Sequence, residues 1–123
     1  MNFIKLRISG NGLPHEEIRG KLKINAEYNY NELADCIIYT KEADLSVPID
    51  TLVGGFVDEL YAERDFLLSL SASYEMTLWL SVYPEKEQAQ IGISNSNLQK
   101  IADCGVDFHA TVMFLEQFYN GAF

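Results

Sequence analysis

Apolar and polar residues alternate along several short segments, which is typical of strands that bury one face of a sheet. The alternation is clearest in residues 76–82, where methionine, leucine, leucine and valine occupy every second position. Segments rich in β-branched and aromatic residues extend this interpretation to other parts of the chain. The pattern predicts strands over residues 3–8, 28–30, 35–40, 76–82, 88–93 and 106–115.

Apolar residues at spacings of three and four predict the longest helix, over residues 49–61. Gly54 and Gly55 interrupt this pattern, and we attribute them to close packing of the helix on a sheet or to a local bend rather than to a ligand-binding role. Residues 66–70 then continue as a further turn or as a separate short helix.

End signals predict two more helices. Pro14 followed by two glutamates marks the start of a helix over residues 14–22, because proline and negative charge both suit a helix N-terminus. Ser94 or Ser96 can cap a helix over residues 94–104. The glycine that follows is the residue best suited to end it.

The predicted order is strand–helix–strand–strand–helix–strand–strand–helix–strand. Hairpins and segregated helices favour an α+β fold with a mostly antiparallel sheet and helices packed on one face. The length of 123 residues and the apolar fraction of 48% suit a single domain with one core, over residues 1–123. The aromatic tail over residues 116–123 could be flexible.

Acidic residues gather in residues 27–65, which hold ten carboxylates and two basic residues, whereas residues 1–26 carry a net charge of +3. The whole chain carries −9. This negative field repels nucleic acid and anionic lipid, and it attracts basic protein surfaces. The apolar stretches are too short to span a bilayer and the N-terminus lacks a secretion signal, so we expect a cytoplasmic protein.

Residues able to perform chemistry are few and dispersed. His15 lies in the first turn of a predicted helix and His109 in the last predicted strand, and neither belongs to a metal-binding or nucleophile–base motif. For Cys36 and Cys104 we expect two buried thiols, with one disulfide as the alternative. We therefore expect no enzymatic activity, no cofactor and no metal.

One segment carries a family resemblance. It is the run Arg7-Ile8-Ser9-Gly10-Asn11-Gly12-Leu13-Pro14-His15-Glu16-Glu17-Ile18, followed by Leu22 and Ile24. The run resembles the opening of the bacterial family known as domain of unknown function 4279, and the order of elements in the second half looks similar too. The resemblance implies a small α+β domain that recurs as a stand-alone bacterial protein, and it carries over no catalytic residue. Residues 25–47 depart from the family pattern, which has a tryptophan and a basic stretch there.

The acidic balance and small size also resemble those of immunity proteins, which neutralise toxin domains by binding them. We therefore favour an immunity protein that occludes the basic active-site surface of a toxin such as a nuclease. Tyrosines accompany the acids, and tyrosine is a favoured interface anchor, although such residues can also simply edge a sheet and keep a protein soluble. The predicted partner-binding residues are Glu27, Tyr28, Tyr30, Glu32, Asp35, Glu42 and Asp44, with Asp58, Glu59 and Glu63 as a second patch.

Two other functions remain open. The chain could be a small ligand-binding or enzymatic domain that uses the open face of the sheet, around Trp79, Tyr83, His109 and Tyr39. It could also be an accessory module of a homo-oligomer, with the aromatic residues of 118–123 at the contact.

Overall fold

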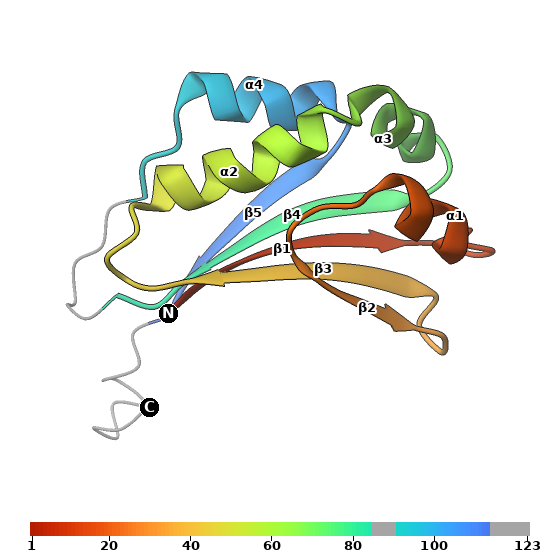
Figure 1. Ribbon diagram of the computed structural model, residues 1–123, viewed down its shortest axis with the longest axis horizontal. Coiled ribbons are helices and arrows are strands. Elements are labelled where there is room, and N and C mark those ends of the chain that lie inside the picture. The colour runs from red at the N-terminus through yellow and green to blue at the C-terminus, as the bar shows by residue number, and fades with distance from the viewer. Residues whose placement is uncertain (85–90, 114–123) are drawn as a thin grey trace.

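The computed structural model describes residues 1–84 and 91–113, which form one α+β domain (Figure 1). A sheet makes one layer and helices make the other. The strands are β1 (Asn2–Ser9), β2 (Glu27–Asn31), β3 (Cys36–Ala43), β4 (Glu75–Val82) and β5 (Asp107–Val112). The helices are α1 (His15–Lys21), α2 (Ile49–Tyr61), α3 (Arg64–Ser71) and α4 (Asn95–Asp103).

The strands lie in the order β2-β3-β1-β4-β5, so the first strand of the chain occupies the centre of the sheet. Neighbouring strands are antiparallel except for β4 and β5, which are parallel. The prediction of an α+β fold with a mostly antiparallel sheet is therefore confirmed. A parallel pair needs a crossover connection, and α4 lies within the connection from β4 to β5.

The prediction of a hairpin after β4 is wrong. Of the proposed second strand, residues 88–90 lie outside the described residues, and residues 91–93 form no strand. Ile91 and Ile93 instead pack against the hydrophobic core. Alternating apolar residues show that a segment buries one side, but they do not show whether it pairs with a sheet. The last predicted strand, residues 106–115, corresponds to β5, and residues 114–115 lie outside the described residues.

Sequence signals place the helix ends well. Pro14 immediately precedes α1. Ser94 caps α4, because its hydroxyl accepts a hydrogen bond from the backbone N–H of Asn97 at 3.2 Å. Gly105 follows α4 with a φ of 72°, a left-handed conformation that glycine adopts without strain. Residues 66–70 lie in a separate helix, α3.

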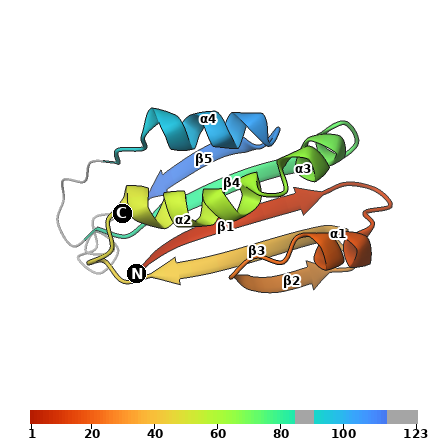
Figure 2. The same cartoon turned by 45° about the horizontal axis from the view of Figure 1, so that its top comes forward.

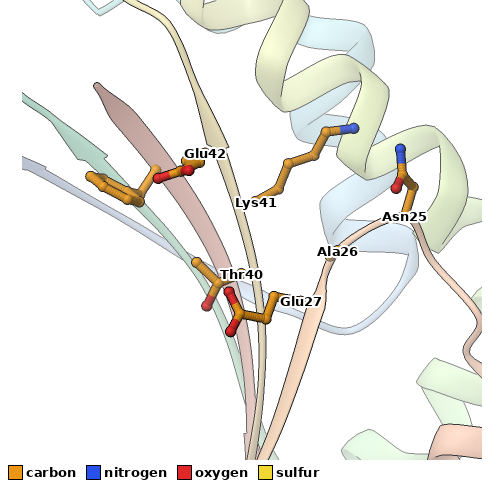
Figure 3. A pocket seen from close by; sticks show the side chains of 7 residues that line it. Asn25, Ala26, Glu27, Thr40, Lys41 and Glu42 are labelled. Atoms are coloured by element: carbon orange, nitrogen blue, oxygen red, sulfur yellow. The ribbon is translucent and has the colours of Figure 1, made fainter.

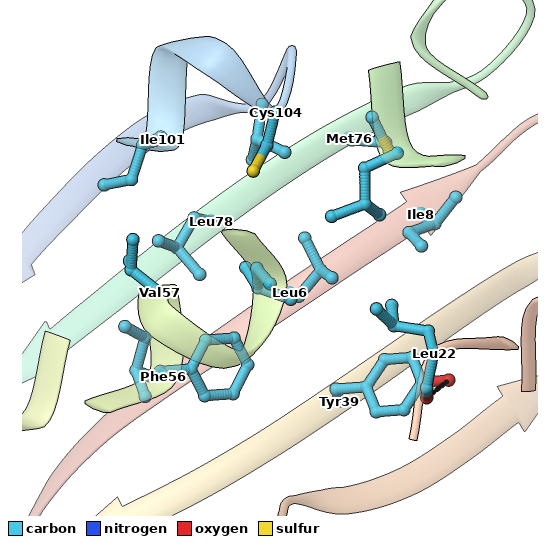
Figure 4. Packing of buried hydrophobic residues seen from close by; sticks show 14 of the residues in the cluster. Leu6, Ile8, Leu22, Tyr39, Phe56, Val57, Met76, Leu78, Ile101 and Cys104 are labelled. Atoms are coloured by element: carbon cyan, nitrogen blue, oxygen red, sulfur yellow. Dashed lines mark hydrogen bonds between the residues drawn. The ribbon is translucent and has the colours of Figure 1, made fainter. Parts of the chain in front are cut away.

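The helices cover one face of the sheet and leave the other open (Figures 1 and 2). In β1, Ile4, Leu6 and Ile8 point toward the helices and are fully buried, whereas Lys5 and Arg7 point to the open face and are exposed. The same alternation in the other strands builds one core between the layers, with Phe56 and Val57 of α2 above Leu6 and Leu78 of the sheet (Figure 4). The core residues that are labelled in Figure 4 are Leu6, Ile8, Leu22, Tyr39, Phe56, Val57, Met76, Leu78, Ile101 and Cys104.

Gly54 permits the close approach of two helices. A Cβ atom on Gly54 would lie 3.1 Å from the side-chain nitrogen of Asn97, so any other residue would require this side chain to shift by a few tenths of an ångström. The nearest neighbours of Gly54 therefore belong to α4, whereas the sequence interpretation expected close packing on the sheet. Among the described residues, no helix is long and apolar enough to cross a membrane.

Candidate functional site

Asp35 is engaged within the protein. Its carboxylate accepts hydrogen bonds from the backbone N–H of Gly12 at 2.8 Å and of Leu13 at 3.4 Å, and from the hydroxyl of Tyr30 at 3.4 Å. Its φ of 48° closes the turn between β2 and β3, in a conformation that aspartate tolerates. Asp35 thus ties this turn to the loop between β1 and α1, so its carboxylate serves the fold.

Two of the three acids predicted as a second patch hold the helix layer in place. The Asp58 carboxylate accepts a hydrogen bond from the Lys100 ammonium at 2.7 Å, which joins α2 to α4. The Glu59 carboxylate accepts one from the backbone N–H of Asn25 at 3.0 Å, which joins α2 to the segment before β2. Glu63 lies exposed between α2 and α3.

Asp50 has a similar structural role that the sequence does not reveal. Its carboxylate accepts hydrogen bonds from the backbone N–H of Ser94 at 3.0 Å and from the side-chain amide of Asn97 at 2.9 Å. These donors lower the pKa of Asp50, because they favour the ionised form. Asp50 therefore fastens the start of α2 to the start of α4, and only the tertiary fold brings these segments together.

Tyr39 lies on the helix-covered face of β3, not on the open face where the ligand-binding hypothesis placed it. Its side chain is 2% exposed, and its hydroxyl donates to the backbone carbonyl of Leu22 at 3.0 Å. Burial raises the pKa of Tyr39 to about 12. Side chains of one strand alternate between faces, and Tyr39 shares its face with Ile37 of the core.

Tyr28 and Tyr30 also point to the helix side, where each is half-buried against α1. The Arg19 guanidinium lies 4.8 Å from the centre of the Tyr28 ring, and the His15 ring stacks on Tyr30 with 4.0 Å between centroids. Partial burial raises the pKa of both phenols. Since Glu27 faces the opposite side of β2, the predicted tyrosines and acids do not form one surface.

The remaining acids of the first predicted patch stay exposed around the β2–β3 hairpin. Glu27 and Glu42 lie on the open face, because Glu27 pairs across the strands with Thr40 and Glu42 lies two residues beyond Thr40 in β3. Lys41, between Thr40 and Glu42 in β3, extends instead toward α2 (Figure 3). Glu32 lies in the turn and Asp44 follows β3. We call Glu27, Glu32, Glu42 and Asp44 the hairpin carboxylates.

A shallow hollow of about 370 Å³ opens beside two of the hairpin carboxylates, at the end of the hairpin away from the turn. The residues around it are Phe3, Asn25, Ala26, Glu27, Thr40, Lys41 and Glu42 (Figure 3). Nearby, the backbone N–H of Ser46 donates to Asp44 at 2.9 Å and lowers the pKa of that carboxyl, which keeps it ionised.

Leu33, in the turn between β2 and β3, has a fully exposed side chain (101%). The turn that carries it is ordered by hydrogen bonds: the Asn31 side chain accepts from the backbone N–H of Ala34 at 3.1 Å, and Glu32 C=O accepts from the N–H of Asp35 at 3.3 Å. A leucine held out by an ordered turn offers apolar area that a partner can bury, so Leu33 is a candidate contact residue. Its position between two predicted strands is the only signal for it in the sequence.

The open face has an aromatic centre. Trp79 is 41% exposed, its indole N–H donates to the Thr111 hydroxyl at 3.0 Å, and its ring stacks on His109 with 5.1 Å between centroids. Toward the end of β4, Phe3 and Tyr83 meet edge to face at 5.8 Å. Three residues of the ligand-binding hypothesis, Trp79, Tyr83 and His109, therefore lie on this face, whereas Tyr39 does not.

The cysteines lie on opposite faces of the sheet and are both free and buried. Cys36 faces the open side, where the Arg7 guanidinium donates to its sulfur at 3.3 Å, and Cys104 lies in the core below the end of α4. Burial raises the pKa of Cys104. The prediction of two buried thiols is confirmed. In residues 1–84 and 91–113, no group of three or more metal-ligating side chains comes together.

Comparison of the chain with protein-family models, with curated proteins and with solved structures found no match.

Proposed function

We propose that this chain is a non-enzymatic binding protein that covers the basic surface of a partner protein, in the manner of an immunity protein against a toxin. The observation that carries the proposal is the exposure of the four hairpin carboxylates at one edge of the sheet. These four carboxylates remain exposed, whereas those of Asp35, Asp58 and Glu59 accept hydrogen bonds from other segments of the protein.

The arrangement of the hairpin carboxylates favours a cationic partner. Glu27 and Glu42 are diagonal neighbours on two paired strands, a separation of roughly 7–8 Å at which like charges repel. In the described part of the chain, no ion pair involves any of the four. A basic group placed between Glu27 and Glu42 is attracted by both carboxylates, which favours binding of a cationic surface.

Lys5 is the basic residue nearest to this pair on the same face, because it pairs with Thr40 across β1 and β3. Lys5 therefore borders the acidic surface on the side that faces the centre of the sheet. The other side of the acidic surface, toward β2, is left open. The partner should therefore approach the hairpin from the sheet edge, where Glu27 and Glu32 lie.

The proposal is tested with the product of the gene adjacent to this one, since toxin and immunity genes must be expressed together to protect the cell. We expect the two proteins to form a complex whose affinity falls steeply as salt increases, and expression of this chain to restore growth of cells that produce the partner. The proposal fails if the neighbouring product is not bound, or if it is bound without loss of its toxicity.

A second candidate function is ligand binding on the open face, and the exposed Trp79 favours it. A polar hollow of about 620 Å³ lies beside the Trp79–His109 pair, with Glu75, Thr77 and Asp107 among its residues. Native mass spectrometry of the purified protein provides the test. A small molecule that is retained by the protein and lost from Trp79→Ala supports this function, and a bare polypeptide mass for both proteins counts against it.

A further inference from the structure

The outer edge of β2 has free backbone groups. β2 is the terminal strand of the sheet and pairs with β3 only, and no other strand of residues 1–84 or 91–113 pairs with it. Alternate N–H and C=O groups of an edge strand point away from the sheet and are able to bind another strand. The edge therefore supplies main-chain donors and acceptors in a row.

β2 lacks several of the features by which proteins prevent strand addition. Its sequence, Glu-Tyr-Asn-Tyr-Asn, contains no lysine and no proline, and its register with β3 runs without a bulge from Glu27–Thr40 to Asn31–Cys36. Its short length and the negative charge of Glu27 are the features that limit pairing, and the charge selects for a basic strand. α1 packs over the helix-side face of β2, through the contacts of Arg19 and His15, and leaves the edge itself free.

The two sides of β2 differ in chemistry. Tyr28 and Tyr30 lie half-buried on the helix side, where the guanidinium of Arg19 lies over the Tyr28 ring. Glu27 faces the open side together with two asparagines, and Glu32 follows in the turn. A strand added at this edge would place alternate side chains beside the tyrosines and beside the carboxylate.

We infer that an extended segment of the partner, in which apolar and basic residues alternate, binds as an added strand along β2. Its apolar residues contact Tyr28 and Tyr30, and its basic residues lie on the open side with Glu27. Main-chain hydrogen bonds supply affinity, and the alternation fixes which face of the segment points inward. The inference rests on the proposed function for the basic nature of the partner and adds the mode of binding.

A defined peptide tests the mode of binding without the natural partner. The probe is a capped heptapeptide of alternating lysine and valine, added to the ¹⁵N-labelled full chain. We expect the amide signals of residues 27–31 to shift and nuclear Overhauser effects to connect the peptide backbone to β2. The matched peptide is N-methylated at two adjacent central residues, which keeps its charge but blocks pairing along both of its edges. We expect it to bind at least about tenfold more weakly.

Two protein variants provide the matching control. Glu27→Lys combined with Asn29→Lys places lysines on the edge strand and should abolish peptide binding. Glu75→Lys combined with Ser73→Lys makes the same change in charge at exposed positions at and just before β4 and should reduce the affinity less than threefold.

Three results overturn the inference. The first is equal binding of both peptides, which means attachment by charge alone. The second is a set of amide shifts centred on Trp79 instead of residues 27–31, and the third is no binding of the parent peptide. The proposed function is judged separately, because each of these results leaves a complex with the neighbouring gene product unaffected.

Discussion

The acidic segment of this protein has two parts with different uses of charge. In α2, Asp50, Asp58 and Glu59 accept hydrogen bonds from residues of other segments, at 2.7–3.0 Å. Around the β2–β3 hairpin, four carboxylates are exposed, of which Asp44 accepts a hydrogen bond from the nearby Ser46, and Asp35 is tied to a distant loop. Both parts look alike in the sequence, because each is rich in Asp and Glu.

The difference comes from what lies opposite each carboxylate. The acids of α2 lie opposite the N-terminus of α4, a lysine and a backbone N–H that donates to one of them. They therefore stabilise the packing of the helix layer. The hairpin lies at the edge of the sheet, where no further element of residues 1–84 and 91–113 pairs with β2. We propose that the charge there serves to bind a partner. The following substitutions separate the two uses.

The largest effect on stability is expected from Asp50→Ala. This change removes the two hydrogen bonds that the Asp50 carboxylate accepts and leaves the buried amide of Asn97 without its main acceptor, so the free energy of unfolding should fall by about 2 to 3 kcal/mol. Urea denaturation measures it. Glu42→Gln, in the hairpin, is the matched control and should change stability by less than about 0.5 kcal/mol. Equal losses for the two variants would erase the distinction.

Tyr39 gives the hairpin a pH dependence in alkali. Its pKa is raised from 10.0 to about 12, so the folded protein holds the phenol proton that the unfolded chain releases. The stabilisation is complete below pH 10 and is lost as the pH rises to 12, by up to about 2 kcal/mol. Unfolding measured across this range should show a steeper decline for the natural protein than for Tyr39→Phe. A parallel decline would mean that another group is responsible.

Asp58→Asn should have a small effect. The Asp58–Lys100 pair is short, at 2.7 Å, but the Asp58 side chain is 62% exposed. Exposed ion pairs contribute roughly 0.2–1 kcal/mol, and salt screens them. We expect a loss of about 0.5 kcal/mol in dilute buffer that shrinks at high salt. A loss above about 2 kcal/mol would show that this pair is as important to the helix layer as Asp50.

Leu33→Asn should have the smallest effect on folding, because the leucine side chain is fully exposed. The thermal midpoint should stay within about 1 °C of that of the natural protein. If Leu33 is buried against the partner, the same variant should weaken the complex by at least about tenfold. A clear loss of thermal stability would indicate that Leu33 packs within the protein after all.

Most of the fold could be predicted from local patterns. The alternation in β1 and β4 and the apolar stripe of α2 each report which side of an element is buried, and the predicted ranges agree with the structure to within a few residues. The parallel pairing of β5 was not predictable in this way. Periodicity describes one segment at a time, whereas strand direction depends on the path of the connection through α4.

The candidate site was harder to predict, because the role of a carboxylate depends on distant residues. Asp35 contacts Gly12, which lies 23 positions earlier, and Asp58 contacts Lys100, which lies 42 positions later. Tyr39 was placed on the wrong face because the register of β3 against β1 is not visible in the sequence. The exposure of Glu27 and Glu42 agrees with the predicted acidic surface, and binding by them stays a prediction.

The most direct test compares two triple variants of equal charge in their binding to the neighbouring gene product. The hairpin variant is Glu27→Gln, Glu32→Gln and Glu42→Gln, and the helix-layer variant is Glu63→Gln, Asp65→Asn and Asp103→Asn. For the hairpin variant, we expect the dissociation constant to rise about 100-fold or more and to lose most of its salt dependence. For the helix-layer variant, we expect the dissociation constant to change by less than about threefold. Equal weakening by both triples, or none by the hairpin triple, would contradict the claim that the hairpin carboxylates bind the partner.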